Sequence, residues 1–138
     1  MPTGRLGIDF SDILARNVTA FADNSTITVA TAAACIGLAV TISADDTIAL
    51  AADGQPVIGK LLKVEADLAC TVQVRGFATL PGGTGATLTR GRRLCGALLV
   101  AAPGYVRTIA TGTAAESNAA GPVAWNVGTT TAVVCDFG

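Results

Sequence analysis

The sequence predicts an all-β fold, a small β-barrel or sandwich of about ten short strands with an extended N-terminal arm. The first observation is spacing, because clusters of turn-forming residues recur roughly every 8–12 residues between short apolar runs. The second is the stretch Val57–Gly83, in which Val72 and Val74 alternate with Thr71 and Gln73, as in a half-buried strand. The third is composition, since small and β-branched residues suit tightly layered strands.

The composition also predicts assembly. The 138 residues are enough for one domain, and 51% of them are hydrophobic, 14% are charged and the mean hydropathy is +0.57. So few charges, with a net charge of −1, do little to keep protein molecules from associating. We therefore favour an apolar surface that another subunit covers, and the alternative is a very apolar monomer. The near-neutral charge argues against binding of nucleic acid.

Residues 1–24 are expected to form the arm, and residues 25–138 the β domain. Glycine and proline punctuate the arm, and large apolar side chains are spread along it without a clear period. A single helical turn is predicted from Ser11 through Arg16. Fully extended, the arm would reach roughly 80 Å at about 3.3 Å per residue, far enough to leave its own domain.

Short strands are expected from residue 26 onward, separated by Pro/Gly/Asp clusters. Asp53-Gly54 is a favoured hairpin pair, Pro103-Gly104 reads as a turn, and Pro81-Gly82-Gly83 reads as the exposed tip of a central hairpin. Residues 111–120 are small and polar, with one helical turn at most. The expected strands are Thr26–Ala30, Cys35–Ile42, Thr47–Leu50, Val57–Glu65, Ala69–Leu80, Thr87–Leu88, Leu94–Ala101, Tyr105–Ile109, Pro122–Val127 and Thr130–Phe137.

Two further segments bear on location. Residues 24–44 carry no charge over a length that would span a bilayer, but polar Ser and Thr interrupt them and their apolar residues alternate with period 2. They are therefore predicted to be strands rather than a membrane helix. The first residues lack the basic region and apolar core of a signal peptide.

Four cysteines, Cys35, Cys70, Cys95 and Cys135, lie far apart, with no C-x-x-C pair. The sequence has no histidine, so a zinc site would need all four thiolates from separate strands. We expect four reduced, buried cysteines that pack as small hydrophobic residues. Disulfides formed later, outside the cell, stay open.

Four catalytic or cofactor interpretations are not supported by the residues. Without histidine, Ser-His and Cys-His nucleophiles are excluded. The glycine-rich segment 81–91 lacks the lysine of a phosphate-binding loop, and segment 64–69, which resembles a lipoyl hairpin, has Leu68 where the carrier lysine would stand. The acidic residues most suited to a carboxylate pair fall at expected turns or a strand bend: Asp45, Asp46, Asp53, Glu65 and Asp67. We expect neither an enzyme nor a cofactor or metal site.

The chain resembles a known family over about three-quarters of its length, outside the arm. The matching segments are GLAVTISADDTIALAADGQPVIGKLLKVEAD, CTVQVRGFATLPGG, LTRGRRLCGALL, PGYVR and WNVGTTTAVVCDFG. In this order they are similar to the small capsid decoration, or cement, proteins of bacteriophages. The resemblance is one of pattern and small residues rather than of a catalytic signature.

This resemblance implies a virion structural protein on the outer surface of a phage head, made in the host cytoplasm. It would clamp adjacent subunits of the major capsid protein as a homo-oligomer, with a trimer favoured and a dimer open, and with no nucleic acid or membrane partner. We expect the anchors Ile8, Phe10, Ile13 and Leu14 to hold the arm on the capsid, the alternative being an arm folded on its own domain. The runner-up is a tail or spike component of the virion, or a carbohydrate-binding β domain on its surface that uses Trp125 or Tyr105.

Overall fold

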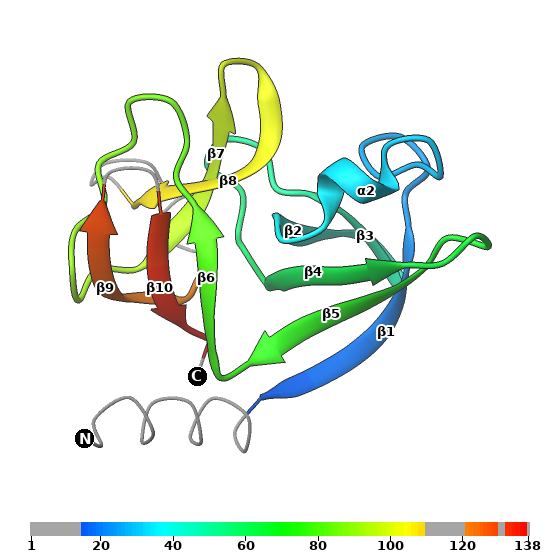
Figure 1. Cartoon of the computed structure of the whole chain (residues 1–138), viewed down its shortest axis with the longest axis horizontal. Coiled ribbons are helices and arrows are strands. Elements are labelled where there is room, and N and C mark those ends of the chain that lie inside the picture. Colours follow the sequence, from blue (N-terminus) through cyan, green and yellow to red (C-terminus); the bar gives the residue numbers. More distant parts are fainter. Residues whose placement is uncertain (1–14, 110–120, 130–131, 138) are drawn as a thin grey trace.

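The structure is a computed structural model and describes residues 15–109, 121–129 and 132–137. These residues form ten strands and one short helix, so the all-β prediction is confirmed (Figure 1). The elements are β1 (Arg16–Ala22), α2 (Ala32–Cys35), β2 (Ala39–Ala44), β3 (Thr47–Leu50), β4 (Gly59–Val64), β5 (Ala69–Arg75), β6 (Phe77–Pro81), β7 (Leu94–Leu99), β8 (Ala102–Thr108), β9 (Val123–Thr129) and β10 (Ala132–Asp136).

The strands form three sheets. β1, β3, β2, β4 and β5 close into a barrel in that order, β6, β10 and β9 form a three-stranded sheet, and β7 pairs with β8. Figure 1 shows the barrel on the right and the three-stranded sheet on the left. In the described part of the chain, no helix is long and apolar enough to cross a bilayer.

β1 corrects the expected boundary of the arm. Residues 16–22 were expected in the arm, but they pair antiparallel with β5 from Arg16 to Phe21 and join β3 in parallel at Phe21 and Ala22. They are therefore part of the barrel. Arg16 begins this strand rather than ending a helical turn, and residues 1–14 lie outside the described residues.

The segment Thr26–Ala30 is a turn rather than the expected strand. The Asp23 carboxylate accepts N–H bonds from the residues that follow it, and the Thr28 and Thr31 hydroxyl groups lie 2.9 Å apart. These local bonds compete with strand pairing and lead the chain into α2. Ile27 still reaches the core, where it is fully buried. The apolar alternation here reports burial of one side chain and not a strand.

The central stretch Val57–Gly83 contributes to two sheets. β4 and β5 form an antiparallel hairpin in the barrel, but the chain then breaks at Gly76, where φ is +87°. β6 leaves for the other sheet, so the expected strand Ala69–Leu80 is two strands. Gly82 and Gly83 are buried, because the Gly83 N–H donates to the Val106 carbonyl at 3.1 Å. The expected exposed tip is therefore wrong.

Two other expected turns differ in the structure. Asp53-Gly54 is a turn with Gly54 at φ +77°, but it closes no hairpin, because β2 lies between β3 and β4. Pro103 and Gly104 lie inside β8. Proline is tolerated there because it lies near the start of β8, where the pairing with β7 is irregular between Ala97 and Leu99.

Two hydrophobic clusters fill the molecule. The barrel cluster contains Ile27, Cys35, Val40, Ile48, Leu50, Leu61, Cys70 and Val72. The second cluster contains Ala39, Ala51, Val57, Leu80, Leu94, Val106, Ala124, Val133 and Cys135. We call the barrel one half of the molecule and the other two sheets the second half. The second cluster also contains residues of the barrel half, such as Ala39 of β2, so side chains of both halves pack together.

Gly96 on β7 joins the halves through the backbone. Its carbonyl accepts the Gly54 N–H at 2.9 Å, and its own N–H donates to Gln55 at 2.7 Å. A methyl group on Gly96 would run into the backbone carbonyl of Ala52. Only glycine therefore permits this close approach.

The β7–β8 hairpin ends in a strained turn at Val100 and Ala101. Val100 has φ +61° and its side chain is 86% exposed. A β-branched residue in the left-handed region costs about 1–2 kcal/mol. Its N–H donates to the Thr84 hydroxyl, which ties the turn to the neighbouring loop.

Val100→Gly should raise the free energy of unfolding. Relief of the left-handed strain exceeds the added entropy of the unfolded chain, for a net gain of about 0.5–1 kcal/mol. Urea denaturation measures this. The matched control is Ala101→Gly, at a turn position whose φ is not positive, which should instead lose about 0.5–1 kcal/mol. A Val100→Gly variant less stable than wild type would contradict the strain.

Candidate functional surfaces

The acidic residues predicted to occupy turns do so. Asp45 and Asp46 lie in the β2–β3 turn, and Asp67, in the β4–β5 turn, accepts the Ala69 N–H at 3.1 Å. Glu65 forms a 2.9 Å salt bridge with Lys63, and both side chains are more than half exposed. Among the described residues, no group of three or more Cys, Asp or Glu is placed to hold a metal ion.

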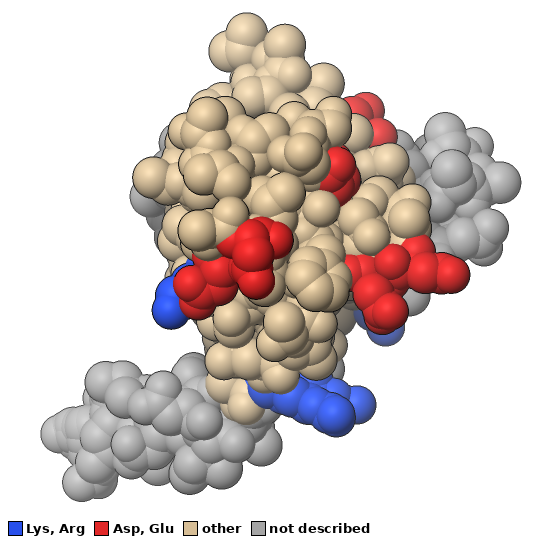
Figure 2. Space-filling view, turned by 90° about the vertical axis from the view of Figure 1, so that its right-hand side faces the viewer, with Lys and Arg blue, Asp and Glu red and all other residues tan. Residues whose placement is uncertain are grey.

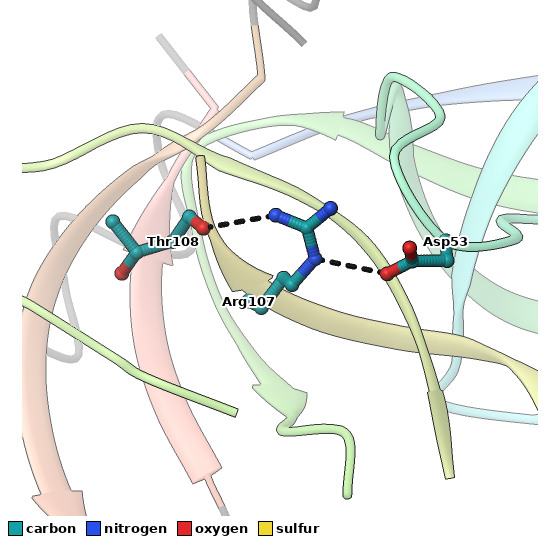
Figure 3. A network of polar contacts seen from close by, with 3 residues as sticks. All are labelled: Asp53, Arg107 and Thr108. Atoms are coloured by element: carbon teal, nitrogen blue, oxygen red, sulfur yellow. Dashed lines mark hydrogen bonds and ion pairs between the residues drawn. The ribbon is translucent and has the colours of Figure 1, made fainter. Parts of the chain in front are cut away.

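Asp53 pairs with Arg107 beside a cleft. The Arg107 Nε donates to Asp53 Oδ1 at 2.9 Å, and its Nη1 donates to the Thr108 carbonyl at 3.3 Å (Figure 3). The cleft of about 650 Å³ is also lined by residues 84–87 of the glycine-rich loop. Among the described residues that line this cleft, the Asp53 carboxylate balances the Arg107 charge, whereas a phosphate site needs unopposed positive charge.

Asp23 has a lowered pKa for a structural reason. Burial alone would raise its pKa, but N–H donors from Thr26, Ile27 and Ser25 stabilise the carboxylate and outweigh burial. The Thr26 hydroxyl donates to Asp23 at 2.9 Å and accepts the Leu50 N–H at 2.9 Å. Asp23 therefore fastens the end of β1 to β3.

All four cysteines are buried and none is in a disulfide. Cys35 and Cys70 belong to the barrel cluster and Cys135 to the second cluster. Burial raises the pKa of the Cys70 thiol, and it raises that of Cys135 to about 12. Such thiols are inert, which fits the prediction that they pack as small hydrophobic residues.

Exposed apolar side chains gather on the barrel half. Of the eight large apolar residues that are exposed in the described part of the chain, five lie in or near β1, α2 and β2: Val18, Phe21, Val29, Ile36 and Ile42. Figure 2 shows the barrel side, where uncharged residues cover most of the described surface and the carboxylates form separate groups.

Val18 and Ile42 are exposed although they lie on core-facing sides of their strands. Val18 pairs with the buried Val72, and Ile42 pairs with the buried Ile48, and directly paired residues share a face of the sheet. Both line a hollow of about 260 Å³, whose other apolar walls include Ala20 and Ile58. In the described part of the chain, the barrel is open at this hollow, and β1 joins β3 at only two residue pairs.

Comparison with protein-family models, curated proteins and solved structures finds no match to this chain. Its function must therefore be argued from its own surfaces. The predicted arm anchors Ile8, Phe10, Ile13 and Leu14 lie outside the described residues. Of the two aromatic residues considered for sugar binding, Tyr105 is half-buried and Trp125 is 63% exposed.

Asp23 should make stability depend on pH in the acid range. The pKa of Asp23 is lower in the folded than in the unfolded chain. Its contribution to the free energy of unfolding is therefore complete above about pH 4, and it is lost as the pH falls through the pKa of the folded state. Asp23→Asn should be less stable at pH 7 and lose less stability between pH 7 and 3, measured by urea denaturation.

Asp45→Asn is the control, since no hydrogen bond to the Asp45 carboxylate is found among the described residues. It should stay within about 0.5 kcal/mol of wild type at pH 7. An Asp23→Asn variant with the full acid sensitivity of wild type would show that the capped turn does not cause it.

Proposed function

We propose that this protein is a virion structural protein that decorates the outer surface of a phage head. It stabilises the head by clamping adjacent major capsid protein subunits, without catalysis. It acts as a homo-oligomer, with a trimer favoured over a dimer. The sequence resemblance to decoration proteins and the exposed apolar surface of the barrel support this role.

The observation that carries the proposal is the uncovered hollow bounded by Val18 and Ile42. Core-facing aliphatic side chains left exposed are costly for an isolated domain, and burying one contributes about 1.5–3 kcal/mol. A partner that covers the hollow recovers this free energy. An apolar patch of this kind favours a protein contact over a small polar substrate.

A lattice makes such a modest contact sufficient. A subunit already held at one face meets the next contact at high effective concentration, so weak contacts multiply into firm attachment. The arm supplies a second contact, with Ile8, Phe10, Ile13 and Leu14 as its proposed anchors on the capsid. Because β1 begins at Arg16, the arm can be removed without cutting the barrel.

Ile42→Ser should weaken assembly or decoration without unfolding the protein. The side chain is 63% exposed, so the monomer loses little, whereas loss of about 1.5 kcal/mol in a contact weakens it roughly tenfold. Analytical ultracentrifugation measures the oligomer, and sedimentation with undecorated heads measures attachment. Val100→Ser, at an exposed apolar site on the β7–β8 hairpin, is the matched control.

If Ile42→Ser matches wild type in both measurements, the hollow is not an assembly surface. Cryo-electron microscopy of the particle then decides the location of the protein. Density on the tail or a spike, rather than on the head, would favour a different virion component.

Deletion of residues 2–14 should leave a soluble oligomer that no longer decorates heads. The deletion spares β1, and it removes the apolar side chains that are proposed to bind the capsid. Binding to undecorated heads and particle stability to heating are the measurements. The control replaces the same residues by a Gly/Ser segment of equal length. Full decoration by the deleted protein would overturn the role of the arm.

A further inference from the structure

Trp125 occupies a β-bulge on the outer face of the three-stranded sheet. β10 pairs Cys135 with Ala124 and Val134 with Asn126, which leaves Trp125 as the extra residue of β9. Bulges redirect side chains and are frequent at functional sites. Trp125 is 63% exposed, whereas its neighbour Ala124 is buried in the core.

Phe77 holds the indole ring in place. The two ring centroids lie 5.5 Å apart at an interplanar angle of 74°, an edge-to-face contact. Phe77 comes from β6, on the other side of β10 from β9. A contact that spans the sheet restricts the rotation of Trp125, so the indole is presented to solvent in a set orientation.

Two charged side chains lie on the same face. Phe77 pairs with Asp136, Asp136 pairs with Val123, and Val123 bridges to Arg93. Directly paired residues share a face, so the aromatic pair, a carboxylate and a guanidinium occupy one side of the sheet. Arg93, Val123 and Asp136 also line a cleft of about 350 Å³.

Arg93 is fixed within this cleft. Its Nη1 donates to the Gly121 carbonyl at 2.9 Å, and Gly121 and Pro122 form part of the cleft wall. A guanidinium has five N–H donors, and a carboxylate is an acceptor. The same side of the sheet therefore carries an aromatic side chain, a donor group and an acceptor group.

We propose that this face binds a pyranose sugar, stacked on Trp125, with its hydroxyl groups bonded to Asp136 and Arg93. The C–H face of a pyranose ring is apolar and packs on an aromatic plane, while hydroxyl groups at its edge need both donors and acceptors. Convergence of a few polar groups on an apolar wall is typical of a small-ligand site. The cleft and the barrel hollow share Ile58 as a wall, but Trp125, Arg93 and Asp136 do not line the hollow.

A sugar fits this face better than a protein partner. In the described part of β6, β9 and β10, Trp125 is the one exposed large apolar residue, whereas exposed apolar residues cluster on the barrel half. The core of a protein interface is depleted of Asp and Glu, whereas the carboxylate of Asp136 lies on this face. The aromatic residue thus shares its side of the sheet with a carboxylate and a guanidinium, which can accept from and donate to hydroxyl groups.

The chain has a single tryptophan, so its fluorescence reports on this site directly. The probes are methyl β-glucoside, methyl β-galactoside, N-acetylglucosamine and the β-linked tetrasaccharides of each, titrated into the full-length protein. We expect a saturable fluorescence change with at least one probe, and heat of binding for that probe by calorimetry.

Variants then assign the binding to the proposed groups by calorimetry. Trp125→Ala should weaken binding by tenfold or more, and Asp136→Asn by about tenfold. Tyr105→Phe, which alters the other candidate aromatic residue, should bind as wild type. Circular dichroism and urea denaturation should give a folded protein for each, since Trp125 is mostly exposed.

Three results would overturn the proposal. They are no binding of any probe, binding that persists in Trp125→Ala, or a Trp125→Ala variant whose oligomeric state changes while no sugar binds. The last result would assign the face to a protein contact. Failure of decoration by the deletion variant would leave these sugar titrations unaffected, so the two proposals are tested separately.

Discussion

The pairing of β1 with β5 closes the barrel, and the rest of the molecule depends on it. Six residues of β1 lie in register with β5, whereas only two pair with β3. Closure on the β5 side removes an open strand edge and covers the barrel cluster around Leu61 and Val72. The short seam with β3, fastened by Asp23 and Thr26, leaves the apolar hollow uncovered.

The two halves of the molecule present different chemistry because they are closed differently. On the barrel half, core-facing residues reach the surface at the apolar hollow. An exposed apolar surface of this kind favours association with another protein. The three-stranded sheet packs its inner face into the second cluster. Its outer face carries an aromatic pair and two charged groups. Gly96 joins the halves by backbone hydrogen bonds, and the second cluster packs residues of both together.

Strand positions were predicted best where turn-forming residues bound a short apolar run. β3 has the predicted bounds, and β7 and β10 lie within theirs. β10 alternates buried and half-buried residues, whereas β3 and β7 are buried at three or more consecutive residues. β1 was assigned to the arm because most of its residues are exposed. The alternation of Val18, Ala20 and Ala22 is therefore difficult to recognise in the sequence. Thr26–Ala30 was assigned to a strand because Asp23, outside the segment, decides its turn through side-chain hydrogen bonds.

The sequence by itself determined the fold class, the burial of the cysteines and the turn positions of most acidic residues. These features follow from the local propensity and hydrophobicity of short segments, which do not depend on residues far away in the sequence. Tertiary structure alone decided that β6 leaves the barrel at Gly76, that β1 completes it, and that Val18 and Ile42 face an uncovered hollow. The same holds for Trp125, Phe77, Asp136 and Arg93, which meet on one face only because β6, β10 and β9 pair in a particular register. β6 and β10 are far apart in the sequence, so no turn between them fixes the register of this pairing.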